Sequence, residues 1–251
     1  MRERRIALTG PQAAALHRLD GFREHGWPLH WVGPAGGRGS GEVIRTRHWT
    51  EPDMIGEVPV APVALVLRHL GGLPAVSDGL SDRDRLELAV EHALRDELVG
   101  LDDLRVPFGR GSGDRLLQEI LALRGTEPAT ESYAETRALQ RFRAFGLTPW
   151  RQVPIVERGK TLHRVDFVIP FRARTRRPAL FLPGHGLVIE IDSRGFHDGR
   201  FYEDHERTLT YDMLGYHWQA FTPNQIEHQP ERVRRAILNG LTGRLVPSMP
   251  R

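Results

Sequence analysis

The chain contains no cysteine among its 251 residues. This absence excludes disulfide bonds, zinc sites built from thiolates and catalytic thiol nucleophiles. It is typical of proteins of the reducing cytoplasm, where we expect this protein to be located. Lysine is nearly missing as well, because Lys160 is the only one and arginine supplies the other long basic side chains. Any chemistry that requires a lysine therefore depends on Lys160.

Long apolar runs are also absent from the sequence. No stretch approaches the roughly 18 consecutive apolar residues that a membrane-spanning helix needs. The first ten residues, MRERRIALTG, lack the apolar centre of a signal peptide. We therefore expect neither export nor a membrane partner. Hydrophobic residues still make up 39% of the chain, which is enough to form a buried core.

Charge is distributed unevenly between the two halves of the chain. Residues 1–127 have a net charge of −3, whereas residues 128–251 have a net charge of +6. A polyanionic partner would therefore bind the second half. The span TEPAT at 126–130 coincides with this change and contains the small and proline residues of a linker. We predict two domains, 1–127 and 128–251.

The first domain is predicted to be mainly helical. Its apolar periodicity indicates helices over 11–26, 60–70, 81–98, 101–104 and 114–123, and one edge strand over 43–48. The glycine-rich span 32–42 is expected to be a loop. It lacks the GK[ST] ending of a phosphate-binding loop.

The second domain is predicted to alternate helices and strands. The expected elements, in order, are a helix at 130–146, strands at 150–156, 163–169 and 187–191, a helix at 200–214, a strand at 216–222 and a helix at 230–241. The predicted fold class is α/β, with a small mixed sheet flanked by helices and preceded by the mainly helical domain.

Three carboxylates occupy the strands of this second domain. Asp166 and Glu190 each interrupt a short apolar run, and Asp192 follows Glu190 by two residues. Residues i and i+2 of a strand point to the same face, and a hairpin would bring Asp166 alongside. Oxygen ligands suit Mg²⁺ or Mn²⁺, which can promote phosphodiester hydrolysis. The alternative for Asp166 is an ordinary acid on a solvent-exposed strand face.

An arginine-rich loop lies between the two acidic strands. Its guanidinium groups can each form paired hydrogen bonds with a phosphate, so we expect them to bind a nucleic-acid backbone. The alternative is a solvated loop without a ligand. The four arginines are Arg172, Arg174, Arg176 and Arg177.

The stretch from Ser132 to Thr222 resembles the nuclease-like domain related to the very-short-patch-repair endonucleases, within the PD-(D/E)xK fold group. The matching pieces are SxxE (Ser132, Glu135), RVDF (164–167), EID followed by histidine (Glu190, Asp192, His197), DxxR (Asp204, Arg207) and LGYHWQAFT (214–222). The resemblance implies a central mixed sheet with acids at one edge. The implied activity is metal-dependent cleavage of DNA.

The resemblance also implies roles for individual residues. Asp166 would be the central ligand for Mg²⁺ or Mn²⁺, and Glu190 would be a second ligand or would orient the attacking water. Asp192 stands where the wider group usually has lysine, a departure that is common in this family. The cationic or proton-donating role would then belong to His197, Arg194, Arg207 or the metal alone. Glu135 would complete the site, unless it is a solvated helix acid paired with a nearby arginine.

The first domain resembles, more loosely, the winged-helix-derived region that precedes such nuclease domains and that also occurs in transcription-regulating antitoxins. The matching pieces are 57–70 and 86–104. Its negative charge favours packing, a protein partner or homodimer formation over the main contact with DNA. The sequence thus predicts a DNA endonuclease acting on duplex rather than single-stranded DNA, in repair, restriction or defence. The alternative is a DNA-binding regulatory protein, similar to an antitoxin, with little or no cleavage.

Overall fold

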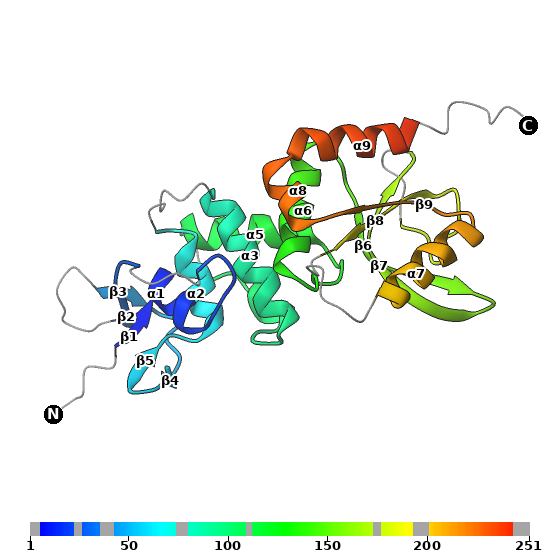
Figure 1. Cartoon of the computed structure of the whole chain (residues 1–251). Helices are drawn as coiled ribbons and strands as arrows, with labels where there is room; N and C mark the ends of the chain where they lie inside the picture. Colours follow the sequence, from blue (N-terminus) through cyan, green and yellow to red (C-terminus); the bar gives the residue numbers. More distant parts are fainter. Residues whose placement is uncertain are drawn as a thin grey trace, which may run out of the picture. The chain divides into compact units, whose positions relative to one another are not determined.

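The computed structural model describes residues 6–22, 27–35, 43–73, 80–108, 112–172, 177–192 and 201–242. The chain divides into two compact units, Met1–Ala129 and Thr130–Arg251 (Figure 1). The division falls within the 126–130 span that the sequence indicates as a linker. Within the described ranges, no helix is both long and apolar enough to cross a membrane.

The first unit combines helices with a five-stranded mixed sheet in the order β3-β2-β1-β5-β4. Strand β1 pairs antiparallel with β2 and parallel with β5. The strands are β1 (Ala7–Thr9), β2 (His30–Pro34), β3 (Val43–Thr46), β4 (Asp53–Ile55) and β5 (Val58–Val60), and the helices are α1 (Gly10–Leu16), α2 (Val63–Leu70), α3 (Asp82–Arg95), α4 (Leu101–Arg105) and α5 (Ser112–Arg124).

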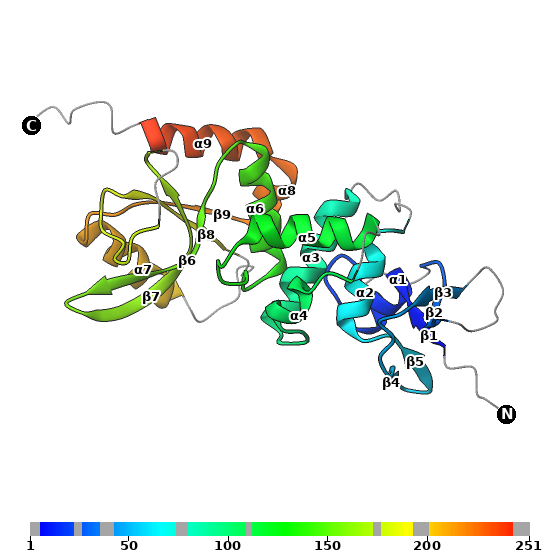
Figure 2. The ribbon, with the colours of Figure 1, turned by 180° about the vertical axis from the view of Figure 1, so that it is seen from behind.

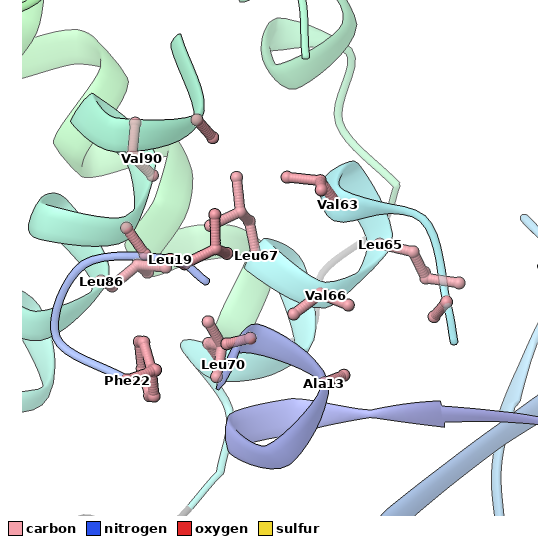
Figure 3. Close-up of a cluster of buried hydrophobic side chains, with 14 of the residues drawn as sticks. Ala13, Leu19, Phe22, Val63, Leu65, Val66, Leu67, Leu70, Leu86 and Val90 are labelled. Atoms are coloured by element: carbon pink, nitrogen blue, oxygen red, sulfur yellow. The ribbon is translucent and has the colours of Figure 1, made fainter. Parts of the chain in front are cut away.

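The core of the first unit forms where α2 packs between α1 and α3. Leu67 and Leu70 of α2 lie close to Leu19 and Leu86 in the interior (Figure 3). Helix α3 begins where the sequence predicts, because the Ser81 hydroxyl accepts a hydrogen bond from the backbone N–H of Asp84 at 3.1 Å. Helices α2, α3, α4 and α5 correspond to four of the five helices that the sequence predicts for this unit.

The sheet of the first unit corrects the expectation of a mainly helical domain. Of its strands, only β3 corresponds to a predicted one. The expected helix at 11–26 is limited to α1, and β2 occupies part of the span expected to be a loop. Strands of three to five residues are too short to show a clear alternation, so the apolar pattern did not reveal them.

The second unit contains a four-stranded mixed sheet in the order β6-β7-β8-β9. Strands β6, β7 and β8 pair antiparallel, whereas β8 and β9 are parallel and are connected through α7. The elements are α6 (Tyr133–Ala144), β6 (Trp150–Glu157), β7 (Lys160–Pro170), β8 (Gly186–Ile191), α7 (Phe201–Met213), β9 (His217–Phe221), α8 (Pro223–His228) and α9 (Pro230–Thr242).

Helices cover both faces of this sheet. Helices α6, α8 and α9 lie on one face and α7 lies on the other (Figure 2). On the first face, Phe167 of β7 and Ile189 of β8 pack with Phe142 of α6. On the second face, Val188 of β8 packs with Tyr211 of α7. The mixed α/β class predicted from the sequence is confirmed, and the predicted order of elements is present with α8 in addition.

Candidate active site

Asp166 and Glu190 lie side by side on neighbouring strands. The antiparallel register pairs Phe167 with Ile189, which places Asp166 level with Glu190. Phe167 and Ile189 point into the core beneath α6, so the two acids project to the opposite face, beneath α7. The expected hairpin and the juxtaposition of these two acids are therefore present in the structure.

Each of these two carboxyl groups has a defined hydrogen-bond donor. The backbone N–H of Ile191 donates to Oδ2 of Asp166 at 2.7 Å. The hydroxyl of Tyr211, which is 0% exposed, donates to Oε1 of Glu190. Both acids are half-buried, and their donors fix the orientation of the carboxyl groups rather than neutralising their charges.

The closeness of the two acids changes their protonation. Burial, together with the charge of Glu190, raises the pKa of Asp166 to about 7. Burial also raises the pKa of Glu190, although the Tyr211 hydroxyl and the charge of Arg207 act in the opposite direction. Two adjacent carboxylates repel each other, so the pair tends to keep a proton near neutral pH unless a cation neutralises it.

Glu135 at the start of α6 is a third acid in this cluster. Its burial, followed by the charge of Asp166, raises its pKa to about 7. The Ser132 hydroxyl donates to Oε1 at 2.9 Å, and both the Glu131 backbone N–H and Gln152 Nε2 donate to Oε2 at 2.8 Å. At 6% exposure, Glu135 is not the solvated helix acid that was the alternative interpretation.

Helix α7 contributes a cation and a phenol to the same face of the sheet. Arg207 is close enough for its charge to lower the pKa of Glu190 and to oppose the raised pKa of Tyr211. The ring of His163 on β7 lies 5.0 Å from the Tyr211 ring, and burial and Arg207 lower the pKa of its imidazole. Among the candidates for a cationic role, the described part of the chain thus places Arg207 beside the acids.

Asp192 is placed differently from the other predicted acids. It follows the last residue of β8 and is exposed, and its backbone N–H donates to the carbonyl oxygen of Phe221 at 2.9 Å. The charges that raise the pKa of Asp166 come from Glu190 and Glu131. Glu135, at the start of α6, is the acid whose pKa responds to the charge of Asp166, so a helix contributes a carboxyl group to this cluster. The role of Asp192 as a metal ligand stays a prediction.

The predicted basic residues divide into three groups. Arg172 is exposed at the end of β7. Arg177 is half-buried and donates to the carbonyl oxygens of Arg151 at 2.9 Å and Gln152 at 3.1 Å, so its guanidinium already binds the backbone of β6. The remaining predictions lie outside the described residues, namely Arg174, Arg176, Arg194 and the candidate acid or base His197.

Sequence reasoning missed three residues of this cluster. Gln152 contacts Glu135, Tyr211 contacts Glu190, and the charge of Glu131 contributes to the raised pKa values of both Glu135 and Asp166. Glu131 adjoins the SxxE motif and could have been included on that ground. Nothing in the local sequence distinguishes Gln152 or Tyr211, because their roles follow from packing between distant segments.

The acids suit a hard divalent cation. Within the described ranges, no group of three or more His, Cys, Asp or Glu side chains is arranged as a metal site. Mg²⁺, however, commonly uses one or two protein carboxylates and completes its shell with water and substrate phosphate. Asp166 and Glu190 meet that smaller requirement, and their mutual repulsion is the kind that such a cation relieves.

Comparisons of the chain with models of known protein families, with curated protein sequences and with solved structures found no match. The chemistry of the site therefore has to be inferred from its own geometry.

Proposed function

We propose that the second unit is a Mg²⁺- or Mn²⁺-dependent endonuclease that hydrolyses phosphodiester bonds in DNA. The observation that supports this most directly is the adjacent pair of half-buried carboxyl groups, Asp166 and Glu190, with raised pKa values. Such pairs are costly to bury and are concentrated at functional sites. A stable fold alone does not require two acids at this position.

The arrangement around the pair supports the same reaction class. A mixed sheet flanked by helices, with acids on two neighbouring strands, agrees with the restriction-endonuclease-like fold that the resemblance implies. The unit has a net positive charge, which favours a polyanionic substrate. Arg172 is exposed near the end of β7, where an arginine would contact a DNA backbone.

Each residue of the cluster has a role in this proposal. Asp166 and Glu190 would hold the divalent ion, which supplies Lewis acidity and a water of lowered pKa. Glu135 orients the attacking water or accepts its proton, because its pKa of about 7 lies in the useful range. Tyr211 fixes the orientation of Glu190, and Arg207 adds positive charge where a phosphate would lie.

The substrate that we favour is duplex DNA, in repair, restriction or defence. The first unit has a net charge of −3, which makes it a poorer DNA-binding surface than the second. We assign it to a protein partner or to a second copy of this chain.

Plasmid cleavage tests the proposal. Supercoiled plasmid is incubated with the protein in Mg²⁺ or Mn²⁺, and the wild type is compared with an Asp166→Ala, Glu190→Ala double variant. We expect metal-dependent nicking or linearisation that the double variant lacks. Glu157→Gln is the matched control, because Glu157 is an exposed acid at the end of β6. Cleavage by the double variant at the wild-type rate would contradict the assignment.

A DNA-binding protein without cleavage is the second candidate. The observation that favours it is the position of the only lysine. Lys160 begins β7, six residues before Asp166, which corresponds to about 20 Å along an extended strand. No lysine can therefore assist at the acids. A wild type that retards DNA in a gel but does not cut it with either metal would support this candidate.

A further inference from the structure

Gln152 has a strained backbone in the middle of β6. Its φ of 49° is in the left-handed region, which costs a residue with a Cβ atom on the order of 1 kcal/mol or more. The β6–β7 ladder pairs Arg151 with Phe167 and Val153 with Val165, so Gln152 lies opposite Asp166. Glycine could adopt this conformation without strain, yet the sequence has a glutamine here.

The strain directs the Gln152 side chain towards the acids. Trp150 and Val153 are three residues apart but pack in the same core, so the usual alternation of β6 is broken at Gln152. The Gln152 side chain is 4% exposed, and its Nε2 donates to Oε2 of Glu135 at 2.8 Å. In a regular strand, Trp150 and Val153 would point to opposite faces, so the irregularity at Gln152 is what lets both pack in one core.

A second side chain, that of Arg177, also binds the distorted backbone. Arg177 donates one hydrogen bond to the carbonyl oxygen of Arg151 and a second to that of Gln152. Its guanidinium therefore binds the two peptide groups next to the left-handed residue. A connected path of hydrogen bonds runs from Arg177 through Gln152 to Glu135.

Helix capping does not explain this arrangement. The backbone N–H of Glu135 is satisfied by the Ser132 hydroxyl at 3.1 Å, and the Glu135 carboxyl in turn accepts from Ser132 and Glu131. A glutamate exposed to solvent could make the same capping contacts. Burying Glu135 beside Asp166 and straining Gln152 both cost stability, and costs of this kind are typical of functional sites.

We propose that Gln152 is a positioning residue, which holds the Glu135 carboxyl beside Asp166 so that the acids act as a unit. This inference rests on the proposed nuclease function, because it assigns a role within the same site. In this role Gln152 does not touch the substrate. It acts through Glu135 alone.

A double-mutant cycle on the full-length protein tests the inference. The four proteins are the wild type, Gln152→Gly, Glu135→Ala and the double variant. Glycine relieves the strain at 152, which offsets part of the lost hydrogen bond, so we expect a melting temperature close to that of the wild type. We expect Gln152→Gly to lower kcat for plasmid nicking at least tenfold with KM unchanged. In the Glu135→Ala background, the same substitution should change kcat less than twofold.

Arg158→Gly is the matched control. Arg158 also has a φ of 49°, but it is exposed in the turn between β6 and β7, so its replacement relieves strain away from the acids. We expect no change in kcat or KM. A loss of kcat from Gln152→Gly that is equal in both backgrounds would overturn the inference, as would a wild-type rate for Gln152→Gly.

Mn²⁺ affinity of the same four proteins, measured by titration calorimetry, gives a second readout when cleavage is too slow to follow. We expect Gln152→Gly to weaken Mn²⁺ binding severalfold only when Glu135 is present, because the water that Glu135 orients would itself be bound to the ion. Equal effects in both backgrounds would overturn the positioning role while leaving the proposed function in place. A wild type that neither cleaves DNA nor binds Mn²⁺ would remove both proposals.

Discussion

At the scale of single residues, Asp166 should reduce the stability of the folded protein at neutral pH. Its folded pKa of about 7 is above the ordinary value of 3.8, so the folded state binds the proton more tightly than the unfolded state. Stability then falls as pH rises from about 4 to about 7, and the full cost is present above pH 7. We predict that Asp166→Asn raises the free energy of unfolding at pH 8 by roughly 1 to 3 kcal/mol. Urea unfolding measures this change.

Two comparisons control this prediction. Glu157→Gln removes an exposed acid and should leave the pH profile unchanged. Mn²⁺ should stabilise the wild type at pH 8 but not Asp166→Asn, because the variant lacks a carboxylate for the cation. If Asp166→Asn is less stable than the wild type at pH 8 without metal, the ionised carboxyl pair does not destabilise the folded state as we infer.

The Tyr211 hydroxyl should stabilise the folded protein most at pH values at which Glu190 is ionised. Tyr211→Phe removes the only hydroxyl that we find donating to Glu190 in the described structure, and leaves a half-buried carboxylate without that donor. We predict a loss of about 1 to 2 kcal/mol at pH 8 and a smaller loss at pH 5. Tyr216→Phe is the control, because its hydroxyl donates at 3.0 Å to the neutral carbonyl oxygen of Phe181. Its cost should be the same at both pH values in urea unfolding.

At the scale of elements, regular periodicity decided what could be predicted from the sequence. Helix α3 and strands β7 and β8 are long or strongly apolar, so their patterns are clear. Helix α8 was missed because it has only six residues. Its start nevertheless has a local signal, since Thr222 and Gln225 form a capping box with proline at the first helical position.

The candidate site was predictable where it depends on strand register. Once β7 and β8 form a hairpin, alternation places Asp166 and Glu190 on one face. Gln152 reaches the acids because its backbone is strained, and Tyr211 reaches them because α7 packs on the sheet. Local sequence patterns predict neither the strain nor contacts between segments that are distant in the chain. The placement of Asp192 depends on where β8 ends, and strand ends are the least predictable feature of a sequence.

The N-terminus of α6 should differ in function from an ordinary helix start. Ser132 directly precedes α6 and Thr222 directly precedes α8, and the hydroxyl of each accepts a hydrogen bond from a backbone N–H of the first turn, at 3.1 and 3.3 Å. Replacing either by alanine should cost about 1 kcal/mol of stability in urea unfolding. Only Ser132→Ala should also lower the rate of plasmid cleavage, because the Ser132 hydroxyl donates to Glu135. Equal cleavage by both variants would show that this hydroxyl serves the helix alone.

At the scale of the whole molecule, the two units have separate cores and opposite charges. One cluster of buried side chains lies entirely within the first unit, and two others lie within the second, on the two faces of its sheet. A separate core is what allows a domain to fold by itself. The second unit contains both the acids and the net positive charge, so the proposed chemistry and substrate binding belong to one unit.

We predict that a fragment of residues 130–251 folds independently and binds duplex DNA as the full chain does. Thermal unfolding followed by circular dichroism should show one cooperative transition for this fragment. Its DNA affinity should fall with salt at the same slope as that of the full chain, since the slope reports how many phosphates the basic residues neutralise. Fragment 1–129 should show no such binding, because its net charge is −3. A steeper slope for the full chain than for fragment 130–251 would instead place DNA contacts on the first unit.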